Sequence, residues 1–470
     1  MTTDTMDFIQ NRTFDEIAIG DSAQLVRTLR PEDIHLFAVM SGDVNPTHVD
    51  PEFARSSQFR EVVGHSMWGS VLISSILGTE FPGPGTVYVG QTLKFWRPIT
   101  IGDTLSVTIT CTKRFEHNHH LLLDCLCVNQ DGLKVIDGTA EVMAPTEKIK
   151  RPRMNLPEIT ISDRQQRYLH VLEMTRGMEP IPIAVAHPCD TESLRGPIQA
   201  RDAGLVIPVL VGPESKIREV AEREHIDLRG VRIVDVPHSH ASAETAVRLA
   251  RCGEVEALMK GSLHTDELMS EVVAKETGLR TSRRLSHVFM ADVPTYPHPL
   301  LITDAAINIE PSLADKVHII QNAIELAIMM GVREPKVAIL SAVETVNEKI
   351  RSTLDAAALC KMADRGQITG GLLDGPLAFD NAVSLVAAKT KGIRSAVAGQ
   401  ADILVVPDLE SGNMVAKQLE YLADALMAGV VLGARVPIVL TSRADTAETR
   451  TASCAIAQLM AHKRRLVTRL

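Results

Sequence analysis

The sequence predicts a chain of two domains, a smaller α+β domain followed by a larger α/β domain. The chain has 470 residues, more than a single hydrophobic core usually organises. Up to about residue 145, several runs alternate apolar and polar positions, which is typical of strands with one buried face. Beyond residue 161, short apolar runs alternate with helical lengths, which is typical of a mainly parallel sheet with helices on both faces.

The first domain, residues 10–145, is expected to wrap strands around an apolar helix. Helical segments are predicted near residues 31–40 and 65–78. Four strand-like runs follow them, TVYVGQTLKF, TLSVTITCTKRF, HLLLDCLCVN and LKVIDGTAEVMA. The NQDG between the last two runs is a hairpin signal. Strands around one central helix make an α+β arrangement.

A linker is predicted at residues 146–161. The surrounding stretch APTEKIKRPRMNLPEITI has three prolines and a basic bias, which is typical of a segment between domains. The second domain then covers residues 162–470. Its apolar runs include IPIAVAHP, IPVLVGP, VEALMKG, KVAILSA, ADILVVPD and VPIVLTS. In such sheets ligands bind beyond the carboxyl ends of the strands, so the polar residues after these runs are the candidates for chemistry.

The composition argues against several classes of function. The net charge is −9 and aromatic residues make up 3%, so neither a basic footprint nor a stacking platform for nucleic acid is expected. The start, MTTDTMDFIQ, has no basic region before an apolar run, and the most apolar tract, LMAGVVLGARVPIVL, is too short to span a bilayer. Seven cysteines without a metal-ligand pattern favour a reducing cytoplasm.

The stretch SGDVNPTHVD places Asp43 and His48 on either side of an Asn-Pro turn that cannot be a regular helix. Downstream, GHSMWGSVLISSILG is an apolar helix that opens near His65 and Ser66. Free N–H groups at a helix start suit a thioester oxygen that gains negative charge. An Asp/His pair beside it could hold a water and move its proton. On spacing alone, a turn aspartate and an ordinary loop histidine explain the pair as well.

A second group of histidines, His117, His119 and His120, is interpreted as a hairpin tip. Alternation would place the first two on one strand face, but no carboxylate or cysteine stands at a useful spacing for a metal. The sequence therefore predicts no metal site.

Residues 10–145 resemble the MaoC-like hotdog domains, the (R)-specific enoyl-CoA hydratases. The resemblance rests on SGDVNPTHVDPEFA, GHSMWGSVLISSILG and YVGQTLKFWRPITIGDTL in that order. It implies that Asp43 and His48 activate water and that a backbone amide at the start of the central helix binds the thioester oxygen. Family members usually read His-Gly-Met there, whereas this chain has Ser66 in place of the glycine. A hotdog that only binds CoA or pairs subunits, and a thioesterase, are the alternatives.

In the second domain, polar residues follow several apolar runs at the starts of helices. They are Lys260 after VEALM, the triplet Ser411, Gly412 and Asn413 after ILVVPDLE, and Ser442 with Arg443 after VPIVLT. Small residues at helix starts let backbone amides meet an anion, and an arginine fork suits phosphate oxygens. No Walker loop or Gly-x-Gly-x-x-Gly is present, so phosphate or CoA is favoured over a dinucleotide. On spacing alone, ordinary caps and turns explain these residues equally.

Residues 165–470 resemble the phosphate acetyl- and butyryltransferases. The resemblance rests on MKGSLHT, LSHVFM, DGPLAFDNAVS, PDLESGNMVAKQLEYLA and VPIVLTSRADT in that order. It implies two α/β subdomains around a cleft, of the isocitrate dehydrogenase type, and dimers. Ser442 and Arg443 would steady the thioester and bind phosphate. The family's base falls on Thr449 here, so Asp445 is the substitute candidate, and Arg280 and Arg284 in GLRTSRR are candidates for the CoA phosphates.

Together these resemblances predict a bifunctional acyl-CoA enzyme. One half would transfer a short acyl group, acetyl or butyryl, from CoA to phosphate, and the other would hydrate trans-2-enoyl-CoA to the (R)-3-hydroxy product. Neither reaction calls for a bound cofactor, since the CoA thioester and phosphate are substrates. We expect a homodimer or higher homo-oligomer without nucleic-acid or membrane partners. Dehydrogenation is a weaker alternative that the absent dinucleotide fingerprint argues against only mildly.

Overall fold

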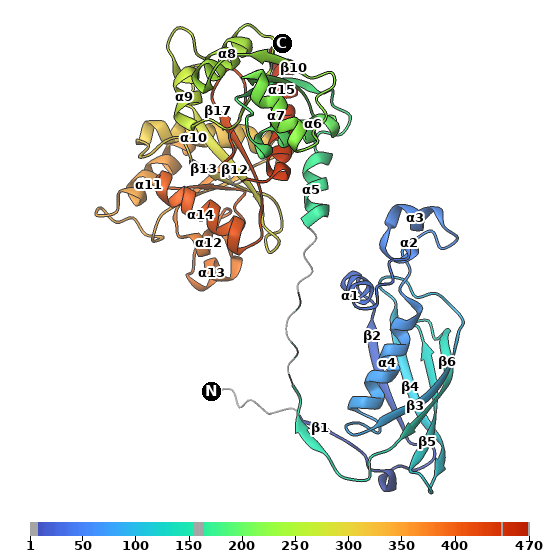
Figure 1. Cartoon of the computed structure of the whole chain (residues 1–470). Helices are drawn as coiled ribbons and strands as arrows, with labels where there is room; N and C mark the ends of the chain where they lie inside the picture. The colour runs from blue at the N-terminus through green and yellow to red at the C-terminus, as the bar shows by residue number, and fades with distance from the viewer. Residues whose placement is uncertain (1–7, 155, 157–158, 160–163, 443–444, 469–470) are drawn as a thin grey trace. The chain divides into compact units, whose positions relative to one another are not determined.

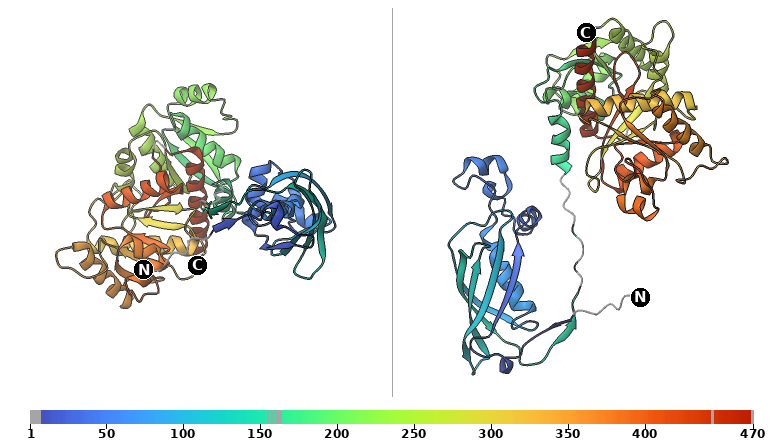
Figure 2. Two further views of the ribbon diagram at one scale, coloured as in Figure 1. Left: turned by 90° about the horizontal axis from the view of Figure 1, so that it is seen from below. Right: turned by 180° about the vertical axis from the view of Figure 1, so that it is seen from behind.

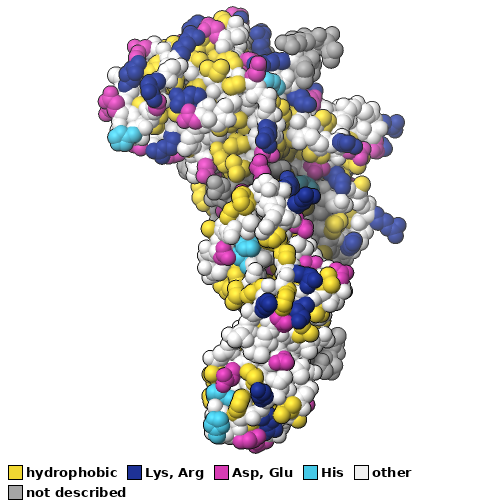
Figure 3. Space-filling view, turned by 90° about the vertical axis from the view of Figure 1, so that its right-hand side faces the viewer, with side chains coloured by type: hydrophobic (Ala, Val, Ile, Leu, Met, Phe, Trp, Pro, Cys, Tyr) yellow, Lys and Arg dark blue, Asp and Glu magenta, His cyan; other side chains and the backbone are white. Residues whose placement is uncertain are grey.

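The computed structural model describes residues 8–154, 156, 159, 164–442 and 445–468. It divides into two compact units, Met1–Ser162 and Asp163–Leu470, which are treated separately below (Figures 1 and 2). Among the described residues, no helix has the length and apolar content needed to cross a bilayer. Acidic and basic side chains are interspersed over the face drawn in Figure 3.

The first unit is an antiparallel sheet wrapped around one long helix, as the sequence predicts. The helix is α4 (Ser66–Thr79), and Figure 1 shows it lying against the sheet. The strand order is β2-β4-β5-β6-β3. The bounds are β2 Ser22–Thr28, β3 Val87–Phe95, β4 Thr104–Phe115, β5 His120–Val128 and β6 Lys134–Met143. Alternate residues of β4 and β5 are buried against the helix, which is the period-2 pattern that identified the strands.

Two glycines let backbone and helix approach closely in this unit. A Cβ on Gly69 of α4 would lie 2.5 Å from Cδ1 of Ile136 on β6. A Cβ on Gly138 would lie 1.9 Å from the carbonyl oxygen of Thr92 on β3. Gly69 thus lets α4 lie close to Ile136 of β6, and Gly138 lets β6 lie close to the backbone of β3.

The structure differs from the sequence prediction at two places in this unit. The stretch around residues 41–50 was predicted as a loop, yet it contains the short helices α2 (Pro46–Val49) and α3 (Pro51–Ser56) after α1 (Pro31–Ser41). Each short helix has proline in its first turn, and Asn45 and Asp50 accept bonds from its first amides. Three residues of the predicted linker form β7 (Lys150–Pro152), which pairs with β1 (Phe8–Gln10).

The second unit is built on one mixed sheet of eleven strands with helices on both faces (Figures 1 and 2). The strand order is β10-β9-β8-β11-β18-β17-β12-β13-β16-β14-β15. The strand bounds are β8 Ile181–Ala186, β9 Val206–Gly212, β10 Arg232–Asp235, β11 Ala257–Lys260, β12 Ser286–Asp292, β13 Leu300–Thr303, β14 Lys336–Leu340, β15 Leu372–Leu377, β16 Ile403–Val405, β17 Leu426–Leu432 and β18 Ile438–Val439. The helix bounds are α5 Arg164–Glu173, α6 Thr191–Asp202, α7 Glu214–Arg223, α8 Ser239–Arg251, α9 Thr265–Val273, α10 Leu313–Met329, α11 Arg351–Asp364, α12 Phe379–Val383, α13 Leu385–Thr390, α14 Leu409–Leu422 and α15 Ala447–Thr468.

Strand direction reverses in the middle of this sheet. Strands β10, β9, β8, β11 and β18 are parallel to one another, and so are β13, β16, β14 and β15. Three antiparallel pairings, β18–β17, β17–β12 and β12–β13, join the two sets. The two parallel sets therefore run in opposite directions, and their carboxyl ends lie at opposite edges of the sheet. Each parallel set forms the centre of one subdomain.

The carboxy-terminal helix α15 is the buried centre of the second unit. Its residues from Ala452 to Leu459 are almost entirely withdrawn from solvent. The side chain of Arg450, near its start, passes over Gly196 of α6, where a Cβ would lie 2.8 Å from Cβ and Cδ of the arginine. The missing side chain at Gly196 thus makes room for a buried guanidinium.

This packing predicts that Gly196→Ala destabilises the second unit although alanine favours helices. The new methyl group overpacks against Arg450, which costs about 1–3 kcal/mol, more than the roughly 1 kcal/mol gained in helix propensity. The measurement is the denaturant midpoint of the second unit. Gly78→Ala is the control, because its Cβ in α4 would meet nothing within 4 Å and should leave its own unit as stable or more so. Equal behaviour of the two variants would contradict the packing argument.

Candidate active sites

In the first unit, a tight reversal after α1 positions Asp43. Helix α1 ends on Gly42, which has φ of 75° and donates its N–H to the carbonyl of Ala38 at 2.8 Å. The side chain of Asp43 then accepts the N–H of Asn45, and Asn45 caps α2. Helix α2 carries His48, so turn chemistry brings the aspartate and the histidine to one side of the chain. Asp43 is exposed and His48 is half-buried.

The tautomer of His48 is set by a backbone carbonyl. Nδ1 of His48 lies 2.7 Å from the carbonyl oxygen of Val63. A carbonyl oxygen only accepts, so Nδ1 must carry the hydrogen and donate it. The other nitrogen, Nε2, then bears a lone pair and can take a proton from water.

His65 belongs to this site, although no role of its own was predicted for it. Its side chain is buried, and Nε2 donates to the carbonyl oxygen of Asp43 at 3.0 Å. Its ring stacks on His48 with centroids 4.1 Å apart and on Phe37 at 4.7 Å. The histidine therefore supports the loop that presents Asp43 and the ring that presents the free nitrogen. The only sequence signal for it was its place just before an apolar helix.

The geometry of Asp43, His48 and His65 suits a held water better than a shared ion. Their candidate ligand atoms lie within 4.8 Å of one another, and no other such group of three His, Cys, Asp or Glu side chains occurs among the described residues. The two imidazoles, however, lie face over face at 36°, so their lone pairs do not converge on one point as metal ligands do.

The histidines predicted to form a hairpin tip lie where β4 turns into β5. His119 has φ of 57° in that turn and packs edge-on against Phe14, with centroids 5.1 Å apart. His120 begins β5, and its Nδ1 lies 2.7 Å from a carboxylate oxygen of Glu141. These contacts give the histidines structural partners at the tip of the sheet.

The start of α4 faces the same loop and offers backbone donors. His65 is its N-cap and exposed Ser66 its first residue, and the amide of Trp68 bonds to the carbonyl of His65 at 2.9 Å. The first amides of a helix have no acceptor within it. A Cβ on the preceding Gly64 would lie 2.6 Å from Cδ2 of Leu29, so the chain needs glycine to enter the helix here. Exposed Met67 and Val71 continue along the same helix.

In the second unit, exposed Ser442 follows the end of β18 on a loop held from beneath. Its backbone N–H donates to a carboxylate oxygen of Asp445 at 2.7 Å. The guanidinium of Arg450 donates to the hydroxyl of Thr441 at 2.7 Å and to the carbonyl of Ser442 at 2.8 Å. The backbone of Ser442 is therefore held in place just beyond the carboxyl end of β18. In open α/β sheets, ligands bind at the carboxyl ends of strands. Arg443 lies outside the described residues.

Buried charges surround the base of this loop. Burial lowers the pKa of Arg450, and the nearby Asp445 opposes that effect. Burial also lowers the pKa of Lys417, but Glu420 and Asp445 outweigh it, so that the lysine's pKa is raised. Nζ of Lys417 lies 3.5 Å from Asp445. Asp445 is therefore a buried anion between two cations. Arg450 and Lys417 were not predicted as site residues.

Lys260 is the last residue of β11 and lies under the same strand ends. It is buried, with Nζ 3.4 Å from the carbonyl of Thr441 and 3.5 Å from that of Gly261. A Cβ on Gly261 would lie 2.4 Å from the carbonyl of Ala186, so β8 and β11 approach each other closely here. The structure therefore places Lys260 beneath Thr441, the residue that precedes Ser442.

The triplet Ser411, Gly412 and Asn413 forms the first turn of α14 rather than an open anion cradle. The amide and the hydroxyl of Ser411 both bond to the capping Asp408, at 2.8 and 2.7 Å. A Cβ on Gly412 would lie 2.9 Å from the carbonyl of Asp304, so the helix start packs on the turn after β13. The same helix carries Lys417 to Asp445, which connects the triplet to the Ser442 loop indirectly.

Arg280 and Arg284 line a pocket of 450 Å³ in front of β12. Arg284 donates to Asn308 at 2.8 Å and pairs with Asp315 at 3.3 Å. His287 of β12 pairs with Val431 of β17, which in turn pairs with Ile438 of β18. Counted from this row of paired residues, Arg284 lies three residues toward one edge of the sheet and Ser442 four residues toward the opposite edge. At about 3.3 Å per residue the separation is up to roughly 23 Å. The two arginines therefore lie at the opposite sheet edge from Ser442.

Comparisons with known proteins match both units. A family model described as phosphate acetyl/butaryl transferase matches residues 238–458, and one described as MaoC like domain matches residues 17–120. The phosphate acetyltransferase of Rhizobium meliloti is 62% identical over 64% of this chain and 95% of its own length. The phosphate butyryltransferase of Clostridium acetobutylicum is 40% identical over 61% and 95%. A crystal structure of a branched-chain phosphotransacylase from Enterococcus faecalis V583 has a TM-score of 0.54 and 31% identity, covering 60% of this chain and 99% of that one.

Proposed function

The chain belongs to the phosphate acetyl/butyryltransferase family, and on this premise we propose that its second unit transfers a short acyl group, acetyl or butyryl, from CoA to inorganic phosphate. The observation that carries the proposal is the exposed Ser442 on a loop fixed by Asp445 and Arg450 above the buried Lys260. Acyl length is left open, because one methylene in an apolar pocket changes selectivity by only about 1–3 kcal/mol.

The transfer needs positioning and charge rather than a covalent intermediate. A phosphate oxygen attacks the thioester carbonyl carbon, the C–S bond breaks, and the thiolate of CoA leaves with the electron pair. Ser442 would donate its hydroxyl to the carbonyl oxygen or the departing sulfur, and Arg443 would hold phosphate. Lys260 and Arg450 supply positive potential from below the loop, where low dielectric strengthens it.

For Asp445 we propose a positioning role instead of the base role predicted from the sequence. Its carboxylate is buried, accepts the N–H of Ser442 and lies beside Lys417. Thr449, at the position of the family's base, is also buried and carries no acid. Because phosphate is already an anion and CoA leaves as a thiolate, transfer toward acyl phosphate requires no base at this place.

For the first unit, a MaoC-like hotdog domain, we propose (R)-specific hydration of trans-2-enoyl-CoA. Asp43 and Nε2 of His48 would hold a water, remove its proton and return a proton to C2 while the hydroxyl adds to C3. The fixed tautomer of His48 supports this role, since its free lone pair is the one that faces away from Val63. Amides at the start of α4 would stabilise the enolate oxygen.

A hotdog that only binds CoA, and a thioesterase, are the competing proposals for this unit. Serine at position 66 favours these alternatives, because its side chain adds bulk at the helix start where the family usually has glycine. A thioesterase would release thiol from saturated acyl-CoA without phosphate.

Ser442→Ala should abolish most phosphate-dependent release of thiol from acetyl-CoA and butyryl-CoA. Losing one donor to the developing charge costs about 100- to 1,000-fold in rate. The assay measures thiol with and without phosphate on the full chain, and hydration of crotonyl-CoA by the same variant serves as its control. Unchanged transfer in Ser442→Ala would contradict the proposed role of this serine.

Asp43→Asn should abolish hydration and leave acyl transfer intact. The amide keeps the shape of the side chain but cannot take a proton, so the rate should fall by about 100- to 10,000-fold. Loss of crotonyl-CoA absorbance measures hydration, and phosphate-dependent thiol release by the same variant reports an intact second unit. Full hydration by Asp43→Asn would contradict the proposed role of Asp43, whereas no hydration by the unmodified chain would favour a non-catalytic hotdog.

We expect the chain to form a homodimer or higher symmetric assembly. Strand β3 is an edge of its sheet, and its side chains Val87 and Val89 are about half exposed, as is the following Trp96. A long apolar edge strand is usually covered in soluble proteins. Light scattering at micromolar concentration measures the mass, and a monomeric value would contradict the expectation.

A further inference from the structure

Buried side chains hold the segment that leads from β18 to Ser442. Strand β18 covers only Ile438–Val439, which pairs with β11 on one side and with β17 on the other. The carbonyl oxygens of the next three residues, 440–442, each lie near a buried side-chain donor. The three donors are His287, Lys260 and Arg450, from β12, β11 and α15. Side chains thus continue the support of this segment where the hydrogen bonds of the sheet end.

His287 is the one of these three donors that the acyl transfer described above does not use. Its side chain is fully buried, and Nε2 lies 3.4 Å from the carbonyl oxygen of Leu440, a long hydrogen bond. Because a carbonyl oxygen only accepts, Nε2 carries the hydrogen and donates it. Burial lowers the pKa of His287, although Asp304 and Asp445 act in the opposite direction, so the ring is neutral and Nδ1 bears a lone pair.

The contact between His287 and Leu440 passes over Gly429 of β17, the strand between β12 and β18. A Cβ at this glycine would lie 3.0 Å from Nε2 of His287 and 2.9 Å from the carbonyl oxygen of Leu440. Any larger side chain would therefore come between the two groups. The ring also packs edge-on against Phe289, with centroids 4.3 Å apart. The glycine and the phenylalanine together fix the direction in which Nε2 points.

The backbone of His287 is bound to the other half of the sheet. Its carbonyl oxygen accepts the hydroxyl of Thr303 at 2.8 Å, and Thr303 is the last residue of β13. Strand β13 belongs to one parallel set, whereas Leu440 follows β18 of the other. His287 therefore connects the segment that carries Ser442 to the opposite subdomain.

Stability alone does not account for a histidine at this position. Nδ1 of His287 has no hydrogen-bond partner among the described residues, and a buried nitrogen without a partner costs free energy. An apolar side chain would fill the same space without that cost. The one feature that an apolar residue could not supply is the donor Nε2 at the carbonyl of Leu440.

We propose that His287 is a positioning residue of the transferase, which holds the carbonyl of Leu440 and through it the hydroxyl of Ser442. The inference rests on the proposed acyl transfer. Because Leu440 is two residues from Ser442, a shift of its carbonyl moves the hydroxyl away from the point where charge develops. A misplacement of about 1 Å can cost on the order of 100-fold in rate. Contacts to the rest of acyl-CoA are unchanged, so kcat falls and KM does not.

Two substitutions of equal length separate the donor from the bulk of the side chain. In His287→Gln the amide nitrogen is as many bonds from Cα as Nε2 of histidine, so it can donate to Leu440. In His287→Met the side chain has the same length and no donor. The assay is phosphate-dependent thiol release from acetyl-CoA and butyryl-CoA by the full chain. We expect His287→Gln to keep kcat within about threefold and His287→Met to lose about tenfold or more, with KM within about twofold in both.

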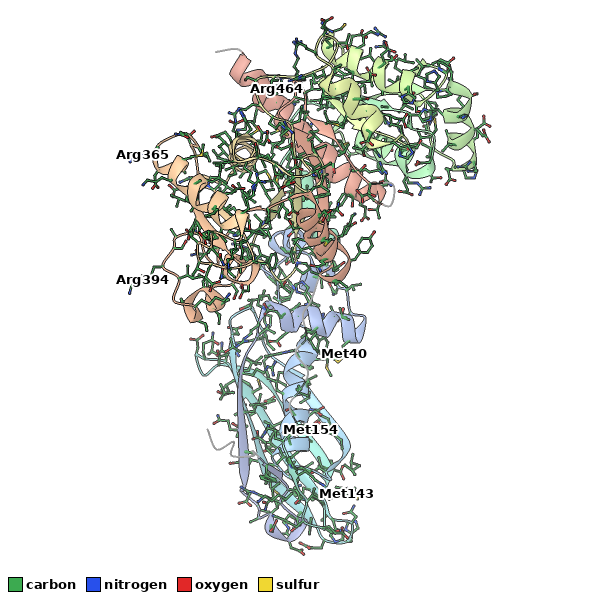
Figure 4. The ribbon with its side chains drawn as sticks, turned by 90° about the vertical axis from the view of Figure 1, so that its left-hand side faces the viewer. Met40, Met143, Met154, Arg365, Arg394 and Arg464 are labelled. Atoms are coloured by element: carbon green, nitrogen blue, oxygen red, sulfur yellow. The ribbon has the colours of Figure 1, made fainter. Side chains whose placement is uncertain are left out.

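The melting temperature should not follow the same order as kcat. Methionine buries no polar group at this place, so His287→Met should be at least as stable as His287→Gln, whose amide oxygen has to be buried. The control is the same pair of substitutions at Arg365, an exposed residue that Figure 4 shows at the surface of the second unit. Both control variants should keep kcat and KM within about twofold, as surface substitutions usually do.

A double variant tests whether His287 acts through Ser442. Adding His287→Met to Ser442→Ala should cause little further loss of kcat, because no hydroxyl is left to position. A further loss as large as that of His287→Met alone would overturn the inference.

The remaining outcomes separate this inference from the proposed transfer. Equal kcat in His287→Gln and His287→Met, or a loss that follows the melting temperature, would overturn the role of His287 and leave the transfer standing. No phosphate-dependent thiol release by the unmodified chain would overturn the transfer and this inference with it.

Discussion

The second unit depends on one buried interaction, the guanidinium of Arg450 beneath the end of β18. It connects the hydroxyl of Thr441 and the carbonyl of Ser442 to α15, and it passes through the space left by Gly196 of α6. A buried cation is costly unless its bonds are made, so strand end, loop and two helices are tied to a single geometry. Asp445 supplies the compensating charge and, by accepting the N–H of Ser442, fixes the loop from its other side.

In the first unit, the site is held in place by hydrogen bonds to backbone carbonyls instead of by a buried charge. Two backbone carbonyls, those of Val63 and Asp43, each accept a hydrogen bond from one histidine N–H and so set the tautomers of His48 and His65. The stack of Phe37, His65 and His48 then holds the rings in place. In both units a proposed reacting group, Asp43 or Ser442, is exposed, while a residue that holds its loop, His65 or Arg450, is buried.

The sequence predicted the parts of each site that follow from chain order, and missed those that depend on packing. Period-2 runs identified the strands, and Asp43, His48, Lys260 and Ser442 stand where strands or turns end. Arg450 escaped prediction because an arginine in the first turn of a helix normally points to solvent, and only the contact with Gly196, far away in sequence, shows that it is buried. Strand direction was also out of reach, since a run such as SHVFMAD has the same pattern in a parallel and an antiparallel pairing.

The net charge of the chain limits how anions can be attracted to it. Acyl-CoA and phosphate are anions, and a chain of net charge −9 repels them at long range. Attraction must then come from local fields, which are strongest where cations are partly withdrawn from water. One such region lies beneath Ser442, where the cations are Lys260, Arg450 and Lys417. Reversal of strand direction separates them from Arg280 and Arg284, which lie at the opposite edge of the sheet.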